Sequence, residues 1–445
     1  MFSAVNAALR THNSIISVRM NKKVLLISYN FKPEPTGIGK YNGEMIDWMA
    51  KNGYDCSVIT TYPYYPYWKV QEPYQNSRFS FKTENFAPQN LNSGATVYRC
   101  PQFVPSAPSG IKRILQEISF FFSASLRLFP LLFNKKYDLV ITVAPSFLLG
   151  LLGVVTKKFT NAKFIYHIQD LQIEAARDLK MIKSEALLNA LFKVEKYIFN
   201  KADFISSISE GMVSKIQAKA QKEVLFFPNW SDTSLFHPIE NKQQLKKQFG
   251  FSESAKVILY SGGIGEKQGL ESILFAARDL RNHTDLKFVI CGSGPYKSIL
   301  QGMAQNLHLD NVIFYPLQPI EKFNQFLNMA DVHLVIQKAT ASDLVMPSKL
   351  TTILAVGGLA LITANEGSSL HSLVKNNNLA IVVDAEDQQA LNQGLLEAVM
   401  SDTDEITKNA RLYAEKYLSI DNVMRDFEET VLSEYTGNPN PAFSV

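Results

Sequence analysis

Residues Tyr260–Leu270 read YSGGIGEKQGL, and this stretch decides the fold. It follows an apolar run that begins at Val257 and favours a β-strand, and it precedes an apolar spacing typical of an amphipathic helix. A strand, a glycine turn and a helix N-terminus let backbone N–H groups approach a phosphate. Lys267 adds a positive charge where negative charge would gather. The stretch therefore predicts one βα unit of a Rossmann-like domain, with Gly263 and Lys267 as candidate anion-binding residues.

A second glycine turn follows about one βα unit later. The apolar run Phe288–Cys291 ends in Gly292-Ser293-Gly294-Pro295, after which another helical pattern begins. Two such turns at consecutive strand ends indicate a nucleotide site along one sheet edge. Neither turn has the GxGxxG or Walker spacing, so each one taken alone is equally compatible with a plain tight turn.

Composition limits the class of protein. The 445 residues suffice for two or three domains, and the formal net charge of +4 argues against a dedicated nucleic-acid binder. The three cysteines lie in or at the end of strand-like runs, so we interpret them as core thiols in a reducing cytosol. Residues 1–22 lack a clean apolar signal region and are expected to be a disordered lead or an upstream start.

Strand-like and helix-like segments alternate along the whole chain, which predicts parallel sheets covered by helices. Two series of similar size predict two Rossmann-like domains facing each other across a cleft. The expected parts are a first domain at 23–228, a linker at 229–255, a second domain at 256–418, a helix at 419–435 that crosses back to the first domain, and a tail at 436–445. Residues 62–95 are expected to form a long, Tyr- and Pro-rich loop.

Six sequence blocks in order carry a family resemblance. They are Asn30–Tyr41, Pro63–Trp68, His167–Asp170, the glycine turn through Leu270, Cys291–Pro295 and Pro347–Leu350. Over roughly residues 22–435 the chain resembles the family 4 glycosyltransferases of the two-Rossmann-domain (GT-B) fold. More narrowly, it is similar to colanic-acid-type fucosyltransferases and related capsule and O-antigen sugar transferases.

The resemblance implies a nucleotide-sugar donor bound mainly by the second domain and a lipid-linked saccharide acceptor held by the first. It also implies retention of the anomeric configuration without an obvious protein base, and no cofactor other than the GDP- or UDP-linked donor as substrate. Catalysis would come from positioning and from stabilising the leaving diphosphate, with Lys267 and His167 as the candidate catalytic residues. The donor-binding candidates are Gly37, Gly39, Gly263, Lys267, Gly292, Gly294, Leu317, Asp343, Ser348, Lys349 and Thr352.

Several of these positions also have a reading from the residues themselves. Gly37 and Gly39 open the first helix, either to admit donor phosphates or simply for packing. His167 ends a strand and is expected to point out at the sheet edge, towards the sugar or the acceptor hydroxyl. Acceptor-side candidates are Tyr65, Asp170 and Glu174, and Glu174 could equally belong to a solvated helix face.

Lys349 follows Pro347-Ser348 at the start of a helix. A cation there opposes the helix dipole, so an anionic ligand explains it better than stability does. The chain departs from the family in the two glutamates that usually lie here. Leu344 and Thr352 occupy those positions, which leaves Asp343 for sugar contact and weakens the expected contact of Thr352 with the ribose.

No metal site is expected. The Asp402-Thr403-Asp404 triplet is better explained as a helix cap, and no other cluster has metal-ligand spacing. The segment 111–136 alternates Phe and Leu with Lys and Arg, which suits a helix lying on an anionic membrane and suits a core helix equally well. We therefore expect a cytoplasmic protein, peripheral at the inner face of the cell membrane.

Two rival functions remain open from the sequence. A nucleotide-sugar 2-epimerase on the same fold would need acid and base residues that the His167 block alone does not supply. A non-catalytic scaffold in an assembly complex would account for the missing glutamates. The sequence leaves the donor base, the sugar, the acceptor and the linkage undetermined.

Overall fold

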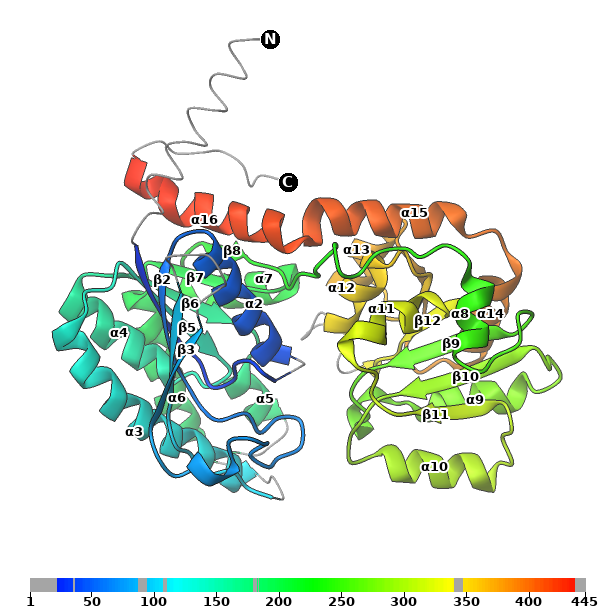
Figure 1. The fold of residues 1–445 in the computed structure, drawn as a ribbon, viewed down its shortest axis with the longest axis horizontal. Helices are drawn as coiled ribbons and strands as arrows, with labels where there is room; N and C mark the ends of the chain where they lie inside the picture. The colour runs from blue at the N-terminus through cyan, green and yellow to red at the C-terminus, as the bar shows by residue number, and fades with distance from the viewer. Residues whose placement is uncertain are drawn as a thin grey trace, which may run out of the picture. The chain divides into compact units, whose positions relative to one another are not determined.

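The computed structural model describes residues 22–34, 37–86, 94–106, 110–178, 182, 184–339 and 347–436, without the side chains of 111, 175, 178, 267 and 432–436. The expected lead and tail, Asp343 and the side chain of Lys267 thus lie outside the described part. The chain divides into two compact units (Figure 1). The first runs to Ile208 and adds Val213–Phe226, and the second comprises Ser209–Met212 and everything from Phe227 on.

The first unit contains an eight-stranded sheet in the order β3-β4-β2-β1-β5-β6-β7-β8. All neighbours pair in parallel except β3, which is antiparallel to β4. The strands are β1 (Lys23–Ile27), β2 (Asp55–Thr60), β3 (Lys82–Phe86), β4 (Ala95–Arg99), β5 (Leu139–Ala144), β6 (Lys163–Ile168), β7 (Phe204–Ser207) and β8 (Val224–Phe226). The helices are α2 (Gly37–Lys51), η1 (Gln75–Ser77), α3 (Gly110–Asn134), α4 (Leu149–Thr160), α5 (Gln172–Asp178), α6 (Glu185–Lys201) and α7 (Glu210–Ala220).

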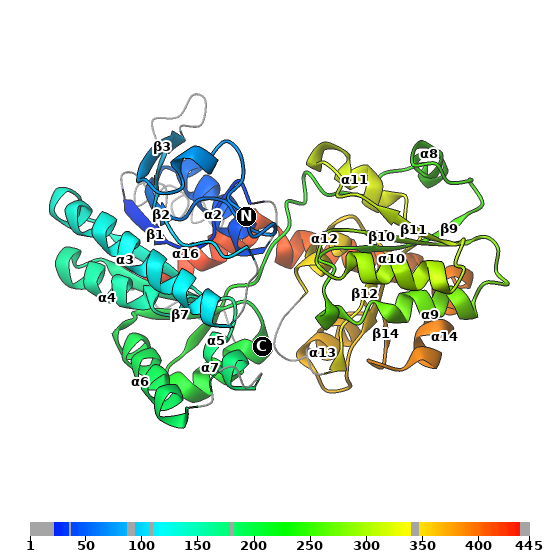
Figure 2. The same ribbon diagram turned by 90° about the horizontal axis from the view of Figure 1, so that it is seen from below.

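The order of the strands reverses at β1, where β2 lies on one side and β5 on the other. Helices α3 and α4 lie side by side on one face of this sheet and α2 lies on the other face (Figures 1 and 2). The expectation of one long loop at 62–95 was wrong in part, because β3 lies inside it. That strand has mostly exposed residues and pairs only at the sheet edge, so it lacks the buried apolar pattern that marks the central strands.

The second unit has a six-stranded, all-parallel sheet in the order β11-β10-β9-β12-β13-β14. Its strands are β9 (Lys256–Ser261), β10 (Leu286–Cys291), β11 (Val312–Tyr315), β12 (Val332–Val335), β13 (Ala360–Thr363) and β14 (Ile381–Val383). Its helices are α8 (Lys242–Gln248), η2 (Glu266–Gln268), α9 (Glu271–Asp279), α10 (Lys297–Asn306), α11 (Ile320–Asn328), α12 (Ser348–Ala355), α13 (Ser369–Asn376), α14 (Gln388–Met400), α15 (Asp404–Tyr413), the π-helical turn η4 (Ala414–Leu418) and α16 (Ile420–Thr436).

Alternate residues of β9 build two separate cores. Val257 and Leu259 pack with residues of α8, α11, α12, α13 and α15, whereas Ile258 and Tyr260 pack with residues of α9, α10 and α14. Successive side chains of a strand point to opposite faces, so a sheet with helices on both faces needs apolar residues at every position of its central strands. Both units are therefore doubly wound α/β layers, which confirms the predicted fold class.

Arg411 of α15 forms hydrogen bonds that connect the predicted linker, residues 229–255, with the core of the second unit. Its guanidinium donates to the carbonyl oxygens of Phe236 (2.8 Å) and Thr233 (3.2 Å), and also to that of Ala355 at the end of α12. Further along, Ser231 N donates to Leu418 O (2.8 Å), and the ring of Phe427 in α16 stacks on Phe227 with centroids 4.1 Å apart. These contacts group α16 with the second unit, and the expected crossing back to the first domain stays a prediction.

We expect Arg411→Ala to destabilise the protein by roughly 2–4 kcal/mol, because several carbonyl oxygens lose a charged donor at once. Arg425→Ala is the control, since the hydrogen bonds of its guanidinium to described residues go to Asp421 O and Asn422 Oδ1 of its own helix. The control should change the stability by less than about 0.5 kcal/mol. The urea midpoints of both variants measure this, and equal midpoints would contradict the role given to Arg411.

Candidate functional site

The two glycine turns of the second unit are bonded to each other. Gly262 N donates to Cys291 O (3.0 Å) and Ile264 N donates to Ser293 O (2.9 Å). An ideal Cβ at Gly292 would lie 1.9 Å from Gly262 O, and one at Gly294 would lie 2.0 Å from Ile264 O. Only glycine lets these two backbones come so close. Gly263 is different, because a Cβ there would meet nothing within 4 Å, and so packing does not require a glycine at that position.

The turns lie where the strand order of the second sheet reverses. β9 has β10 on one side and β12 on the other, so the carboxyl ends of β9 and β12 flank the point at which crossover helices change face. Ligands of open α/β sheets bind outside the carboxyl ends of the strands at such a point. The sheet topology thus selects the turn Gly262–Gly265 as the candidate site of this unit.

Lys349 brings a cation directly against this turn. It lies in the first turn of α12, and its Nζ is 3.7 Å from the centroid of the Tyr260 ring and 3.0 Å from the position of a Cβ at Gly262. Burial of the ammonium group lowers the pKa of Lys349 to about 7, and no carboxylate of the described residues opposes that effect. A desolvated cation whose partner among the described residues is an aromatic face is well placed to receive an anion.

Two more lysines reach the same edge of the sheet. Lys297, the first residue of α10, donates through Nζ to Gly292 O (3.1 Å) and Tyr315 O (3.2 Å). The side chain of Lys338, beyond β12, passes 3.2 Å from the Cβ position of Gly269. The ends of short helices and three lysines make this edge a candidate site for a diphosphate.

The structure places the other donor candidates as follows. Leu317 is exposed just beyond β11, Ser348 is the exposed first residue of α12, and Thr352 lies partly buried one turn later. Lys267 belongs to η2, between the glycine turn and α9. Gly37 begins α2 with φ +61°, a conformation that favours glycine. The assignment of these positions to the donor stays a prediction.

His167 does not point out at the sheet edge as expected. Its ring is buried, with 3% of the residue exposed, and Nδ1 lies 3.0 Å from Ser206 Oγ on the neighbouring strand β7. Strand β6 continues for one more residue to Ile168, which leaves His167 inside the sheet. Burial lowers its pKa to about 3, so the imidazole is neutral at physiological pH. A contact of His167 with the sugar stays a prediction.

The acceptor-side candidates occupy three different settings. Asp170 is exposed beyond β6, at the carboxyl edge of the first sheet. Glu174 of α5 forms an ion pair with Lys219, which also pairs with Glu195 of α6 at 2.6 Å. Tyr65 is partly exposed in the segment after β2, and its ring centroid lies 6.5 Å from that of Trp68. The ion pair with Lys219 gives Glu174 a structural role, because it connects α5 with α7.

Sequence reasoning missed Tyr260, Lys297 and Glu34. The ring of Tyr260 lies against the Lys349 ammonium group. The sequence signal for Tyr260 was an aromatic residue near a strand end, just before a glycine turn. Lys297 repeats the signal recognised at Lys349, a cation in the first turn of a helix where it opposes the dipole. Glu34 was named only within the block Asn30–Tyr41, and its signal was a carboxylate between two prolines, Pro33 and Pro35, in the connection after the first strand.

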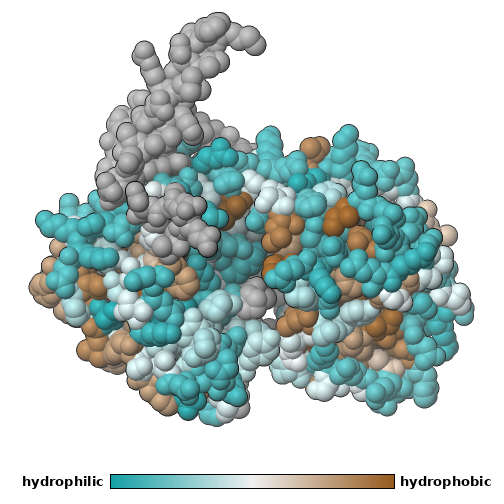
Figure 3. All heavy atoms as spheres, in the orientation of Figure 1, coloured by the Kyte–Doolittle hydropathy of each residue, from teal (hydrophilic) through white to brown (hydrophobic). Residues whose placement is uncertain are grey.

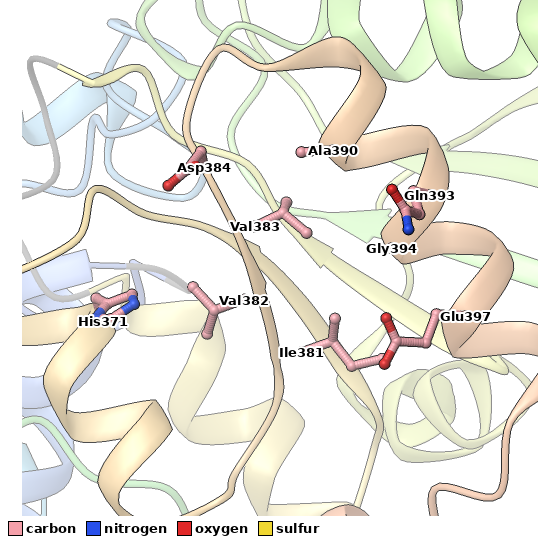
Figure 4. Close-up of a pocket in the computed structure, with 9 residues that line it drawn as sticks. All are labelled: His371, Ile381, Val382, Val383, Asp384, Ala390, Gln393, Gly394 and Glu397. Carbon is pink, nitrogen blue, oxygen red and sulfur yellow. The ribbon is translucent and has the colours of Figure 1, made fainter.

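A cavity of about 280 Å³ lies elsewhere, beside the edge strand β14 (Figure 4). Val382 and Val383 of the strand and Gly394 of α14 line it, together with the polar side chains of His371, Asp384, Gln393 and Glu397. None of the candidate donor residues borders it. Among the described residues, no group of three His, Cys, Asp or Glu side chains could hold a metal ion.

Comparisons with known proteins identify the family of the chain. Residues 241–417 match the "Glycosyl transferases group 1" family model, and residues 36–230 match the "Glycosyl transferase 4-like domain". The chain is 39% identical, over 91% of its length and 98% of the relative's, to "Putative colanic acid biosynthesis glycosyl transferase WcaI" of Escherichia coli K12.

Solved structures show the same fold at low identity. Sucrose-phosphate synthase of Thermosynechococcus elongatus superposes with a TM-score of 0.71 at 15% identity, covering 94% of this chain and 100% of the other. Anabaena Alr3699/HepE, solved in complex with UDP and glucose, gives a TM-score of 0.65 at 12% identity, covering 93% of this chain and 100% of the other.

Proposed function

The chain belongs to the group 1 glycosyl transferases with a transferase 4-like first domain, and on that premise we propose that it builds a bacterial surface polysaccharide of the colanic acid type. It transfers a sugar from a GDP- or UDP-linked donor to a hydroxyl of a lipid-linked saccharide, with retention of configuration and without a catalytic metal. Fucose and an N-acetylated deoxysugar are the candidate sugars. One observation carries the donor assignment: a largely buried lysine, with no carboxylate partner among the described residues, lies against a glycine turn at the reversal point of the second sheet.

The charges at this turn fit the transfer step. The bond from the anomeric carbon to the diphosphate breaks, and negative charge develops on the departing diphosphate oxygen. Lys349, aided by the helix ends, offsets that charge in a partly desolvated place where the interaction is strong. The acceptor oxygen forms the new bond, and its proton leaves with the diphosphate. Neither the epimerase nor the scaffold is favoured, because the relatives with a stated activity are transferases or synthases.

A thermal-shift panel tests the donor assignment. GDP, UDP and the sugars linked to them are added to the protein first without metal and then with Mg²⁺. A ligand at about 100 times its dissociation constant should stabilise the fold by roughly 2.7 kcal/mol. We expect one nucleotide to stabilise selectively and equally with and without Mg²⁺. No response to any nucleotide would contradict the donor site, and a response only with Mg²⁺ would contradict metal independence.

Helix α3 is the part of the first unit that we expect to contact an anionic membrane. Within the described residues, the stretch Lys112–Asn134 is long and apolar enough to cross a membrane, and only a third of its most apolar window is buried. Its exposed side includes Phe122, Leu126 (69% exposed), Phe129 and Phe133 (77% exposed). Figure 3 shows apolar surface at the left edge, in the region where α3 and α4 lie in Figure 1.

The surroundings of this apolar side favour contact over insertion. Phe120, Ala124 and Leu128 on the opposite side of α3 are buried in the first core, so the helix cannot leave the unit. Phe159 of α4 lies beside Phe133, with ring centroids 6.4 Å apart, and extends the apolar surface. Lysines and arginines at the two ends of α3 would meet lipid phosphates: Lys112, Arg113, Lys135 and Lys136.

We expect the double substitution Phe122→Ser and Phe133→Ser to weaken flotation with anionic liposomes by at least about tenfold, because each phenyl side chain buried in lipid contributes roughly 1.5–3 kcal/mol. Met400→Ser is the control, since Met400 is 76% exposed but lies on α14 of the second unit. Flotation that is equal for the double variant and the control, or unchanged on charge reversal at Lys112 and Arg113, would contradict this contact.

A further inference from the structure

Glu34 joins two segments that lie thirty residues apart in the sequence. It is buried, with 3% exposed, in the connection between β1 and α2. Its Oε1 accepts the backbone N–H groups of Tyr64 (3.1 Å) and Tyr65 (3.0 Å), and Oε2 accepts from Asn30 Nδ2 (2.8 Å). A side chain that accepts two consecutive amides fixes the backbone of the segment that supplies them.

The start of α2 is packed against the same carboxyl group. An ideal Cβ at Gly39 would lie 2.7 Å from both Cβ and Oε2 of Glu34. Glu34 thus occupies the space that a side chain at position 39 would need. This explains why one of the two glycines at the start of α2 is Gly39. Asn42 of α2 continues the contact and donates through Nδ2 to Asn30 O (2.9 Å).

The segment that Glu34 holds is the Tyr-rich loop, residues 62–68. The Tyr64 ring makes edge contacts with Tyr29 (5.8 Å between centroids) and with Trp68 (5.7 Å). Arg113 of α3 lies over the Trp68 ring at 5.0 Å. One buried carboxyl thus connects the glycine turn of the first unit, the Tyr-rich loop and, through Trp68, the N-terminal end of the helix expected at the membrane.

Burial makes this carboxyl costly when it is charged. Burial raises the pKa of Glu34 to about 7, against the lowering effect of the Tyr64, Tyr65 and Asn30 hydrogen bonds and of Arg99 on β4. The other titratable groups that face it are the hydroxyls of Tyr29, Tyr64 and Tyr65, whose pKa values are raised. A glutamine keeps the Oε1 acceptor for the two loop amides but places its Nε2, a donor, opposite Asn30 Nδ2. We therefore expect the hydrogen bonds to the loop to depend on the reach of the side chain more than on its charge.

We propose that Glu34 is a positioning residue that holds the Tyr-rich loop against the glycine turn at the start of α2, so that the acceptor-side surface around Tyr65 is formed before the acceptor binds. This rests on the proposed transferase function, in which the first unit holds the acceptor. The role is one of preorganisation. Because the loop is already ordered, acceptor binding does not have to include the entropic cost of ordering it.

Three variants separate reach from charge. Glu34→Gln keeps the length and the Oε1 acceptor, Glu34→Asp keeps the charge but is one methylene shorter, and Glu34→Ala removes both. Glu195→Gln is the matched control, because Glu195 is also a buried carboxyl with a raised pKa but pairs with Lys219 between helices α6 and α7.

The first measurement is amide hydrogen exchange of residues 62–71 in the protein alone at pH 8. We expect exchange at Tyr64 and Tyr65 to accelerate at least about tenfold in Glu34→Asp and Glu34→Ala, since each loses hydrogen bonds worth about 1 kcal/mol or more. Glu34→Gln and Glu195→Gln should stay within about twofold of the wild type. Unchanged exchange in Glu34→Asp overturns the proposal even if Glu34→Ala fails to fold.

The second measurement uses the nucleotide sugar that the thermal-shift panel selects. Hydrolysis of this donor by water needs no acceptor and should be unchanged in Glu34→Asp, whereas the KM for a saccharide acceptor should rise about tenfold. Equal losses in hydrolysis and in transfer would overturn the positioning role. If no nucleotide binds the wild type, the proposed function fails, while the exchange experiment still decides on Glu34.

Discussion

Lys349→Met should weaken nucleotide-sugar binding by roughly 10- to 100-fold and at the same time raise the stability of the protein without ligand. The two effects have opposite signs because the wild type encloses an ammonium group that no carboxylate of the described residues compensates. Methionine fills a similar volume without the desolvation penalty. The diphosphate, on the other hand, loses a charge-assisted hydrogen bond worth about 1.5–3 kcal/mol.

The pH dependence follows from the same group. The pKa of Lys349 in the folded protein is about 7, below its ordinary value of 10.5, so the fold disfavours the charged form. The destabilisation is complete below pH 7 and is relieved as the pH rises from about 7 to 10.5, by up to about 5 kcal/mol. Donor binding needs the charged form, and so the affinity should fall by about tenfold per pH unit above pH 7.

Calorimetric titration with a nucleotide sugar between pH 6 and pH 9 measures this, because a sugar-linked diphosphate keeps its charge over that range. Lys349→Arg is the control variant, since a guanidinium stays protonated and should bind without the decline above pH 7. A wild-type affinity that is level from pH 6 to pH 9, or Lys349→Met binding as tightly as the wild type, would remove Lys349 from the donor site.

Gly292→Ala should destabilise the second unit by at least about 3 kcal/mol, which lowers its melting temperature by roughly 6–12 °C. The new Cβ would lie 1.9 Å from Gly262 O, and this oxygen belongs to the backbone of the paired glycine turn, so it cannot rotate away. Moving the turn would also displace Lys349 from Gly262. We therefore expect the nucleotide-induced thermal shift to disappear together with the stability.

Gly302→Ala is the matched control for this prediction. Gly302 lies in α10 of the same unit, and a Cβ there would meet nothing within 4 Å. Alanine in a helix should raise the stability by up to about 1 kcal/mol. If calorimetric melting of Gly292→Ala matched that of the wild type or of Gly302→Ala, the contact between the two turns would not constrain the site.

The sequence allowed most of the fold to be predicted, because buried parallel strands are continuous apolar runs. The apolar run from Val257 and the run Phe288–Cys291 were predicted as strands and lie in β9 and β10. The edge strand β3 was missed because Lys82, Thr83 and Glu84 have no apolar alternation to mark a strand. Helix α8 was assigned to the linker, since a seven-residue polar segment shows too little periodicity.

The candidate site was predicted in its residues more than in its contacts. Gly292, Gly294 and Lys349 stood out because glycines after a strand and a cation at a helix start are local signals. That Lys349 meets Tyr260, or that Glu34 meets Tyr65, depends on segments that only the folded sheet brings together. The burial of His167 was missed for a related reason: one further strand residue, Ile168, decides whether the ring faces the edge or the neighbouring strand.

The stacked pair Phe227–Phe427 and the bond from Ser231 to Leu418 have a consequence for recombination between related genes. The family model of the second domain covers residues 241–417, so all four of these residues lie outside it. A hybrid protein joined at those borders would take both pairs from one parent protein and the core of the second unit from the other. A hybrid that inherits Phe227–Thr436 from a single parent keeps these pairs beside the core with which they evolved. The second unit of this protein is thus longer, as a segment that related genes could exchange intact, than its sequence family suggests.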